Sequence, residues 1–209
     1  MARNLHLGRV VADRAGARAP RGNATTQALR GAVRRMLEEL GYQALTIEGV
    51  AARSGVAKTS IYRRWPSKAE MVFDLMLHSS DELPPLEDRG SLAGDIDVLA
   101  GRIVALVAGP LGRRIFPGLI GDAAGDPALM ERLRTTIVLD GRQQIAQVLE
   151  RSVRRGELAD TEAVPDLQAV LIGAVLMLVL FEPEMDEGLL RNKIADLAMA
   201  VLSGGPTGV

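Results

Sequence analysis

Apolar residues recur at helical spacing through most of this chain, and this feature limits the folds open to it most strongly. From Asn23 onward they fall at i, i+4, i+7, i+8 and i+11, which is one face of an α-helix: Leu29, Val33, Met36, Leu37 and Leu40. Aromatic residues make up only 3% of the chain, and no segment alternates apolar and polar side chains as a half-buried strand does. With 47% hydrophobic residues the chain can bury a core, so we expect an all-α fold.

The residue types and motifs that many enzymes and metal sites need are scarce. The chain has no cysteine, which excludes disulfides, thiolate metal sites and cysteine nucleophiles. Its two histidines, His6 and His78, are too few for a histidine-rich metal centre. Neither G-x-S-x-G nor a phosphate-binding Gly-Lys-Ser/Thr loop occurs. We therefore expect no metal and no cofactor, and an enzyme built on a helical bundle is a disfavoured alternative.

Charge is distributed unevenly along the chain. Residues 1–79 carry 13 Lys and Arg against six Asp and Glu, whereas residues 80–209 carry 12 against 20, although the net charge of the whole is −1. A basic half beside an acidic half favours a nucleic acid or an anionic membrane as partner of the basic half. The alternative is the general composition of an Arg-rich proteome.

Proline, glycine and charge divide the chain into segments. The first is Arg-rich with little apolar periodicity, and we interpret it as a flexible arm rather than a basic targeting peptide. An acidic stretch with Pro84, Pro85 and Gly90 is the best domain boundary. The predicted division is a basic arm (1–22), a first helical domain with its connecting helix (23–79), a linker (80–90), a larger helical domain (91–203) and a frayed tail (204–209).

Neither end of the chain nor its apolar runs indicate export or membrane insertion. Arginines interrupt residues 1–20, so no long apolar stretch of a secretory signal is present. The longest apolar run, Ala169 to Phe181, has 13 residues, too few to cross a bilayer. We expect a cytoplasmic protein without a membrane partner.

Local signals predict where the helices begin and end. In the first domain Gly41 ends the first helix, Thr46 caps a short second one over 47–54, and a third spans about 58–65 because Pro66 disfavours helical geometry before it. Ser67 and Glu70 form the pattern of a capping box that opens a fourth helix to about residue 79. In the second domain the predicted helices are 91–108, 111–121 with an interruption at Pro117, 127–155, 166–181 and 187–203.

The stretch from Leu45 to Val72 indicates a specific function. Two short helices meeting at a tight turn around Gly55 are a helix-turn-helix. Its predicted small core consists of Ile47, Val50, Ala51, Val56, Ile61 and Trp65. The polar residues of the second helix are left to meet bases and phosphates in a DNA groove: Lys58, Thr59, Ser60, Arg63 and Arg64. Lys68 and the backbone N–H groups after Ser67 suit a phosphate.

This stretch resembles the DNA-binding signature of the TetR (tetracycline-repressor) family. The resemblance covers about 45 residues and is carried by Thr46–Ala52, Gly55–Lys58 and Ile61–Glu70. It implies an N-terminal three-helix DNA-binding domain and a larger helical domain for ligand binding and dimerisation. It also implies that Thr46 and Lys68 touch phosphates, that Tyr62 contacts the backbone, and that Lys58, Thr59 and Ser60 begin the groove-facing helix.

The sequence departs from the family pattern at two places, and some residues have alternative interpretations. Glycine is frequent in the family where Thr59 or Ser60 stands, so base preference cannot be transferred, and Glu70-Met71 stands where many members have leucine. Tyr62 and Trp65 are three residues apart and either could belong to the core. Arg63 and Arg64 could form a solvated face instead of a DNA contact.

The last two predicted helices are the most apolar part of the chain. The resemblance implies that they pair with those of a second subunit in a four-helix bundle, and reading two half-sites requires such a homodimer. The alternative is that they pack inside one subunit. The predicted interface residues are Leu167, Leu171, Ala174, Leu178, Leu190, Ile194, Leu197 and Val201.

The other helices of the second domain are the predicted site of a small-molecule effector. Apolar candidates would enclose it, and a polar row on the long helix would orient it, although such a row is often a solvated edge. The candidates are Ile103, Leu106, Phe116, Ile120, Thr136, Ile137, Asp140, Gln143 and Leu176.

These observations favour a ligand-responsive regulator of transcription. In this hypothesis a homodimer binds a palindromic operator in double-stranded DNA as a repressor, and a small, mostly apolar effector releases it. A helical adaptor or co-regulator without an effector is the alternative of a different class.

Overall fold

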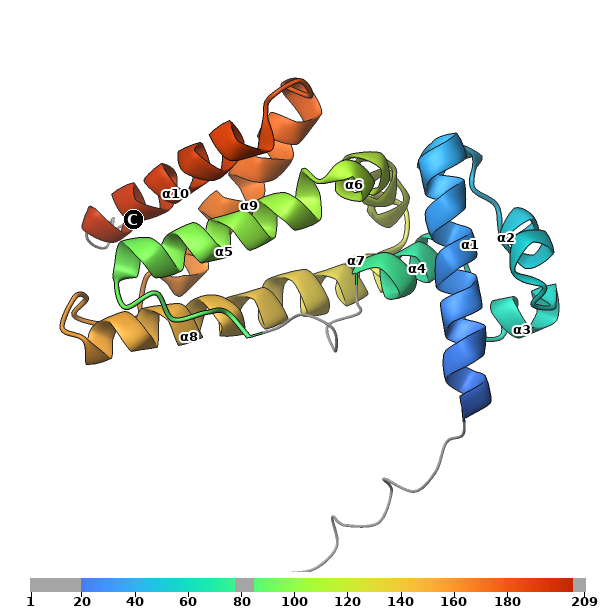
Figure 1. Cartoon of the computed structure of the whole chain (residues 1–209), viewed down its shortest axis with the longest axis horizontal. Helices are drawn as coiled ribbons and strands as arrows, with labels where there is room; N and C mark the ends of the chain where they lie inside the picture. The colour runs from blue at the N-terminus through green and yellow to red at the C-terminus, as the bar shows by residue number, and fades with distance from the viewer. Residues whose placement is uncertain (1–19, 78–84, 205–209) are drawn as a thin grey trace, which may run out of the picture.

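A computed structural model describes residues 20–77 and 85–204, and every regular element in these ranges is a helix (Figure 1). The all-α prediction is therefore confirmed. The first domain consists of α1 (Pro20–Ala44), α2 (Ile47–Ser54), α3 (Lys58–Tyr62) and α4 (Lys68–Val72), which continues as the π-helix η1 (Phe73–Leu77). The second consists of α5 (Leu92–Val107), α6 (Pro110–Ala124), α7 (Pro127–Leu133), the π-helix η3 (Arg134–Asp140), α8 (Gly141–Arg154), α9 (Val164–Phe181) and α10 (Glu187–Ser203).

Most predicted helix boundaries lie within two residues of these bounds, and several differ by more. Helix α1 continues past a kink at Gly41, its predicted end, to Ala44, and α6 ends at Ala124, three residues after its predicted end. The predicted end of the fourth helix near residue 79 lies outside the described residues. Helix α1 begins at Pro20, so the last three residues of the predicted arm are helical; the rest of the arm and most of the predicted tail lie outside the described residues. Helix α3 ends at Tyr62, three residues before the predicted end, and two turn residues follow it. The predicted helix 127–155 is interrupted by the seven-residue π-helix η3.

The predicted interruption of α6 at Pro117 is wrong, because the helix passes through this residue. Proline lacks the N–H that would bond four residues back, and its ring crowds that carbonyl. Packing on two sides holds the segment helical in spite of this cost: Ile115 and Leu119 are buried in one core, and Phe116 is buried in another.

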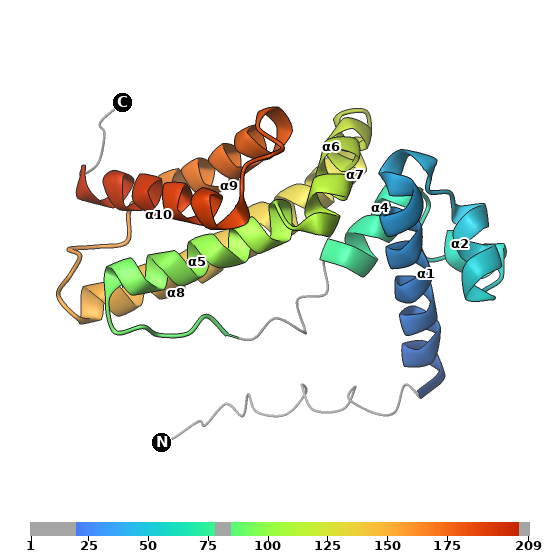
Figure 2. The same ribbon diagram turned by 45° about the horizontal axis from the view of Figure 1, so that its top comes forward.

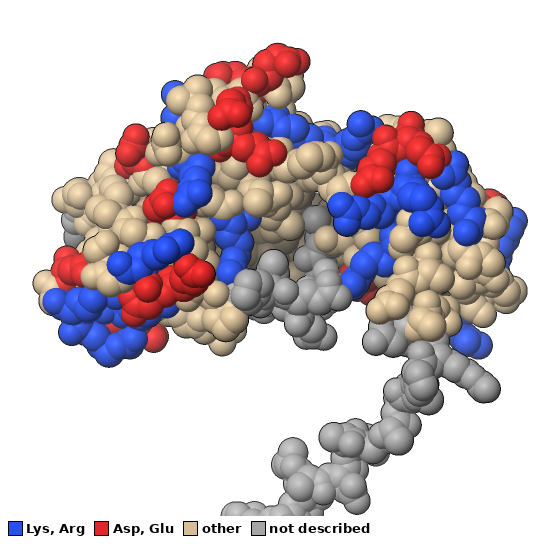
Figure 3. All heavy atoms as spheres, viewed as in Figure 1, with Lys and Arg blue, Asp and Glu red and all other residues tan. Residues whose placement is uncertain are grey.

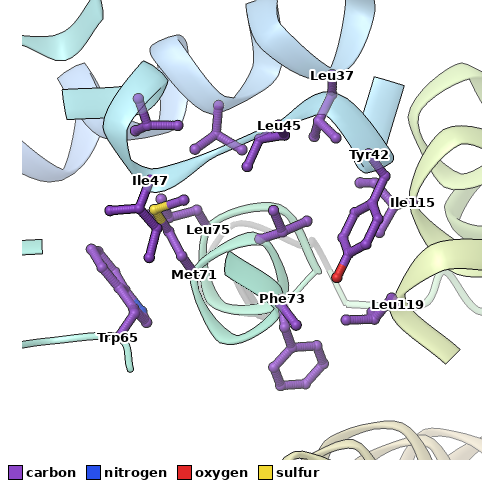
Figure 4. Packing of buried hydrophobic residues seen from close by; sticks show 14 of the residues in the cluster. Leu37, Tyr42, Leu45, Ile47, Trp65, Met71, Phe73, Leu75, Ile115 and Leu119 are labelled. Atoms are coloured by element: carbon purple, nitrogen blue, oxygen red, sulfur yellow. The ribbon is translucent and has the colours of Figure 1, made fainter. Parts of the chain in front are cut away.

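The first core lies between the helices of the N-terminal domain and extends to α6 and α7. Leu37, Trp65 and Phe73 are each at most 1% exposed in it, while Ile115 and Leu119 enter from α6 (Figure 4). The second core is formed by α5, α8, α9 and α10. Helices α6 and α7 therefore lie between the two parts of the molecule, as both ribbon views show (Figures 1 and 2).

Tyr42 anchors α6 to the end of α1. The backbone reverses at Gly41, whose φ of 77° favours glycine, and this turns the Tyr42 ring toward Leu119 (Figure 4). The Tyr42 hydroxyl donates to Asp122 Oδ2 at 2.6 Å. Burial raises the pKa of Tyr42, and the hydrogen bond and charge of Asp122 raise it further. A Cβ on Gly118 would come within 2.2 Å of the ring, so this glycine is what permits the contact.

A buried carboxylate joins the segment before α5 to the end of α8. Asp95 is fully buried, and its oxygens accept from the Arg89 amide at 2.7 Å and from Arg155 Nη2 at 3.0 Å. Arg151 lies 3.6 Å from the same carboxylate and donates to Leu86 O. These contacts hold residues 85–91 against the second core, because an unpaired buried carboxylate is costly.

Helix α9 is apolar enough and, at 18 residues, long enough to cross a membrane by length and composition alone. The sequence estimate of 13 residues was shorter because Asp166 and Gln168 interrupt the apolar run. Only 28% of this helix is buried within the chain. Much of its apolar surface therefore faces away from its own core.

Candidate nucleic-acid interface

The turn between α2 and α3 is fixed by local hydrogen bonds. Thr46 Oγ1 accepts from the Gly49 amide at 3.1 Å and caps α2, as predicted. Gly55 has a φ of 71°, and its N–H bonds to Ala51 O at the end of α2. The left-handed conformation of Gly55 lets α3 follow α2 with only three residues between them.

Helix α3 is anchored on one side and exposed on the other. Ile61 and, just beyond the helix, Trp65 are 0% and 1% exposed in the first core. Tyr62 is 46% exposed, so the core interpretation holds for Trp65 and is wrong for Tyr62. Lys68 is half-buried, whereas six of the polar residues predicted to meet DNA lie on the exposed surface: Thr46, Lys58, Thr59, Ser60, Tyr62 and Arg63.

Glu48 organises this exposed surface, and the sequence analysis did not single it out as a site residue. Its Oε1 lies 3.5 Å from Lys58 Nζ and accepts from the Tyr62 hydroxyl at 3.3 Å. The pKa of Glu48 is lowered first by a backbone hydrogen bond and then by Lys58 and Tyr62. The only sequence signal was an acid in the first turn of α2; its reach to α3 depends on the angle between the helices.

Lys68 was predicted to bind a phosphate, and in the structure it contacts the end of α1. Its Nζ donates to Tyr42 O at 3.3 Å and to Gln43 O at 3.4 Å, and it lies 4.6 Å from the centre of the Tyr42 ring. These carbonyls belong to the last turn of α1, where a cation is favourable. In this structure the Lys68 ammonium group therefore ties α4 to the end of α1.

The predicted capping box at α4 is half formed. Ser67 Oγ accepts from the Glu70 amide at 3.2 Å. The Glu70 carboxylate instead binds Arg132 Nη1 at 2.5 Å, across the interface to α7. A tertiary ion pair has replaced the local return bond that the motif predicts.

Arg132 connects the second domain to the base of α3. Its Nη2 binds Asp74 Oδ1 at 2.5 Å, and Asp74 Oδ2 accepts from Trp65 Nε1 at 2.7 Å. Arg132 of α7 is thus connected through the Asp74 carboxylate to Trp65, the buried residue just after α3. Arg64 lies over the same indole, 4.5 Å from its centre, and donates to Thr26, which makes Arg64 part of the packing around Trp65.

Basic side chains outnumber acidic ones in the first domain even without the arm. Residues 20–77 carry nine Lys and Arg against five Asp and Glu. Figure 3 shows one face of the molecule, on which blue Lys and Arg side chains surround a group of red Asp and Glu over the α1 end. The excess of positive charge over residues 20–77, rather than this mixed face, favours an anionic partner.

The predicted effector residues do not surround one cavity. Ile137 lines a cavity of about 240 Å³ between η3, α8 and α9, and Thr136 lines a separate one of about 200 Å³ beside Phe73 and Arg132. Among the others, Phe116 is buried, Ile103 and Leu176 are partly buried in the second core, and Leu106, Ile120 and Gln143 are exposed. The Asp140 side chain lies outside what the structure describes. Helix phase alone could not tell which candidates point into a cavity.

The predicted dimer residues also need correction. Leu167, Leu171, Leu190 and Ile194 are 0% exposed within a single chain, so the stripe that they form belongs to the second core and offers no surface to another subunit. Ala174, Leu178 and Val201 are half-buried, and Leu197 is exposed. The large apolar side chains that remain exposed on α9 and α10 are Met177, Leu180, Phe181, Leu189 and Leu197.

Comparisons with known proteins agree with this arrangement. Residues 29–75 match the family model of bacterial regulatory proteins of the tetR family, and residues 86–197 match the tetracyclin repressor-like C-terminal domain. The uncharacterised HTH-type transcriptional regulator YdeS of Bacillus subtilis is 31% identical over 141 residues, which cover 68% of this chain and 71% of YdeS. The DNA-binding transcriptional repressor TetR of Mycobacteroides abscessus is 26% identical over 88% of this chain and 97% of its own length.

A solved structure has the same architecture. The crystal structure of the TetR family transcription regulator SCO0332 superposes with a TM-score of 0.66 at 26% identity and covers 85% of this chain and 97% of that one. The matched families consist of transcriptional regulators and not of enzymes. The chain belongs to the TetR family of DNA-binding transcriptional regulators.

Proposed function

We propose that this protein is a repressor that binds a palindromic operator as a homodimer and is released by a small-molecule effector. The observation that carries the proposal is the exposed polar row of α3, whose anchor Trp65 is bonded through Asp74 to Arg132 of the second domain. Regulation of DNA binding by an effector requires contacts that connect the DNA-contacting helix to the effector-binding domain.

The proposed contacts divide between bases and phosphates. Thr59 and Ser60, on the first turn of α3, are assigned to base edges in the major groove. Lys58 and Arg63 are assigned to guanine acceptors or to phosphates, while Thr46 and Tyr62 contact the backbone. Lys68 is assigned to positioning, because its ammonium group already holds two carbonyls of α1.

Dimerisation is assigned to the exposed apolar surface of α9 and α10. Phe181 is 71% exposed and Met177 is 57% exposed, and three more large apolar side chains are exposed on the same two helices. Exposed apolar side chains that cluster in this way mark a site of protein–protein interaction. Covering this surface with its copy would give a two-fold dimer, and its two α3 helices would need to lie about 34–36 Å apart to enter successive major grooves. This assignment also accounts for the apolar α9 without a membrane and fits a protein that acts on DNA in the cytoplasm.

Effector release is assigned to a movement of α7. Because Arg132 bonds both Glu70 and Asp74, a shift of α7 changes the position of α4 and, through Trp65, of α3. Interfaces of this kind switch between discrete arrangements, and a ligand changes DNA affinity only if it binds one of them more tightly.

Operator selection from random DNA followed by fluorescence anisotropy tests the proposal. Lys58→Ala and Arg63→Ala should each weaken binding to the selected site by about 1–3 kcal/mol, or roughly 5- to 150-fold. Arg154→Ala removes an exposed arginine at the far end of α8 and should leave affinity unchanged. A wild-type protein without sequence-selective, salt-sensitive binding would contradict the proposal and favour an adaptor.

A further inference from the structure

The cavity between η3, α8 and α9 has a composition that points to a class of ligand. Its volume is about 240 Å³. Apolar side chains form most of its wall, including Ile137, Ala169 and Ile172, and Arg142 and Gln168 are its two polar lining side chains. A mostly apolar wall with a few directed polar groups is the usual composition of a small-molecule site.

Gln168 is fixed in a single orientation. It is 5% exposed, and its Nε2 donates to Ile137 O at 2.9 Å and to Val138 O at 2.8 Å, both carbonyls of the π-helix η3. Its Oε1 accepts from Arg142 Nε at 3.0 Å. The amide therefore has its donors and its acceptor engaged by the protein, and its function here is to hold Arg142 against η3.

Glycine at residue 141 leaves room for the Gln168 amide in this orientation. A Cβ at Gly141 would lie 2.7 Å from Gln168 Nε2, closer than such atoms approach in proteins. Gly141 is the first residue of α8, directly after η3. Gly141, Gln168 and Arg142 thus depend on one another for their arrangement beside η3. Short π-helical segments within helices are frequent at functional sites.

Arg142 is the charged group of this cavity, and among the side chains that the structure describes no carboxylate pairs with it. Five other arginines of the second domain each pair with an acid: Arg132, Arg134, Arg151, Arg155 and Arg191. Among the side chains that the structure describes, Arg142 bonds to the neutral Gln168, and it does so through Nε. Its two terminal nitrogens keep their planar donor pair, the geometry that binds a carboxylate with two parallel hydrogen bonds.

We propose that this cavity binds a small organic carboxylate, with the carboxylate on Arg142 and the apolar body between Ile137, Ala169 and Ile172. The volume lies below the roughly 300–1,000 Å³ of sites for drug-sized molecules, so the ligand is a short-chain or single-ring acid. The inference rests on the proposed function in one respect: the carboxylate is the effector that the repressor senses.

The position of the cavity connects it to the DNA-binding domain. A carboxylate bound to Arg142 changes the hydrogen bond that Arg142 donates to Gln168. Gln168 in turn donates to two carbonyls of η3. The π-helix follows α7 without a break, and α7 carries Arg132 with its bonds to Glu70 and Asp74. Ligand binding therefore acts on the helix to which we assign the release of DNA.

Isothermal titration calorimetry of the full chain with defined probes tests the ligand class without DNA. The acids are hexanoate and phenylacetate, the uncharged analogues are hexanamide and hexanol, and inorganic phosphate represents an anion without an apolar body. We expect saturable binding of at least one acid and at least tenfold weaker binding of its uncharged analogue and of phosphate. Failure of both acids to bind, or equal binding of hexanol or phosphate, overturns the inference.

Variants place the binding in this cavity. Arg142→Gln should weaken acid binding at least tenfold, whereas Arg154→Gln, an exposed arginine of the same helix, should not. Gly173→Met fills the cavity from α9, where nothing lies within 4 Å of an added Cβ, and should abolish binding at an unchanged melting temperature. Full acid binding by both Arg142→Gln and Gly173→Met overturns the assignment.

The two proposals fail in different measurements. If wild-type protein binds an acid through Arg142 but selects no operator, the proposed function is wrong and the ligand class stands. If it binds an operator and neither acid, the ligand inference is wrong and the repressor remains. Acid binding that leaves operator affinity unchanged contradicts the effector role of this cavity alone.

Discussion

Glu48 is the residue whose position on the DNA-binding surface is least expected. An acid beside residues that approach phosphates opposes binding, yet Glu48 holds both Lys58 and Tyr62. Its lowered pKa means that the folded state favours the carboxylate, so its contribution to stability is present above the ordinary carboxyl pKa of 4.5 and is lost as the pH falls through the lower folded value. The Glu48 carboxylate is therefore charged at neutral pH, and we expect it to compete with DNA phosphates for Lys58.

Glu48→Gln tests this interpretation. Removing one negative charge and freeing Lys58 should raise affinity for non-specific DNA and steepen the plot of log affinity against log salt concentration by about 0.9, equivalent to one more phosphate contact. Anisotropy over a salt series measures the slope. The control is Glu131→Gln, whose partner Arg134 lies in the second domain. A Glu48→Gln slope equal to that of wild type would mean that Lys58 does not gain a contact.

Gly118 is a second residue whose role depends on its neighbour. Gly118→Ala would drive a methyl group into the Tyr42 ring, and we expect the free energy of unfolding to fall by about 1–3 kcal/mol. Gly121 lies on the same helix, and nothing lies within 4 Å of a Cβ added there. Gly121→Ala should therefore raise the free energy of unfolding by up to about 1 kcal/mol, because alanine favours a helix. Denaturant unfolding measures both, and equal effects would mean that Tyr42 does not dock α6.

At the scale of elements, the contact of α7 with α4 and η1 is the connection between the domains. The Glu70 side chain is only 12% exposed in this interface. Removing Arg132 would leave its carboxylate without an ion-pair partner in a largely buried position, which is costly. By contrast, the neighbouring pair of Arg134 with Glu131 is more than half exposed, and such pairs contribute little.

The pair of variants Arg132→Met and Arg134→Met therefore separates the two contacts. Arg132→Met should lower the free energy of unfolding by about 1–3 kcal/mol, and operator affinity should fall because Asp74 and Trp65 lose their support. Arg134→Met should change the free energy by less than about 1 kcal/mol and leave affinity unchanged. Unfolding curves and anisotropy check both, and wild-type operator affinity in Arg132→Met would rule out this route.

At the scale of the whole molecule, DNA recognition depends on the exposed surface of α9 and α10. Met177→Asp with Phe181→Asp would place two charges in the proposed subunit interface. We expect this variant to sediment as a monomer without detergent, to keep its helical signal, and to lose operator affinity by more than 100-fold because one half-site remains. Analytical ultracentrifugation and anisotropy measure the two outcomes.

Leu40→Ser is the control, since Leu40 is 49% exposed but lies on α1, away from α9 and α10. It should leave the oligomeric state as in wild type. A double Asp variant that remains dimeric would place the interface elsewhere, and a wild-type chain that needs detergent to stay in solution would favour a membrane role for α9.

Local signals in the sequence were enough to predict the helices and the helix-turn-helix, because these signals act between close neighbours. Thr46, Ser67, Ser91 and Asp126 cap helices through bonds to amides two or three residues away, and Gly55 sets its own backbone. The exposed row of α3 followed from the same local pattern.

Which apolar faces are buried and which polar groups meet could not be predicted without the three-dimensional packing. Leu171 and Phe181 lie on one apolar helix, yet one is fully buried and the other 71% exposed. Glu70 pairs with Arg132 at a separation of 62 residues instead of returning to its own cap. Such outcomes depend on the packing of elements far apart in the chain, and helical periodicity fixes the direction of a side chain without fixing what stands opposite it.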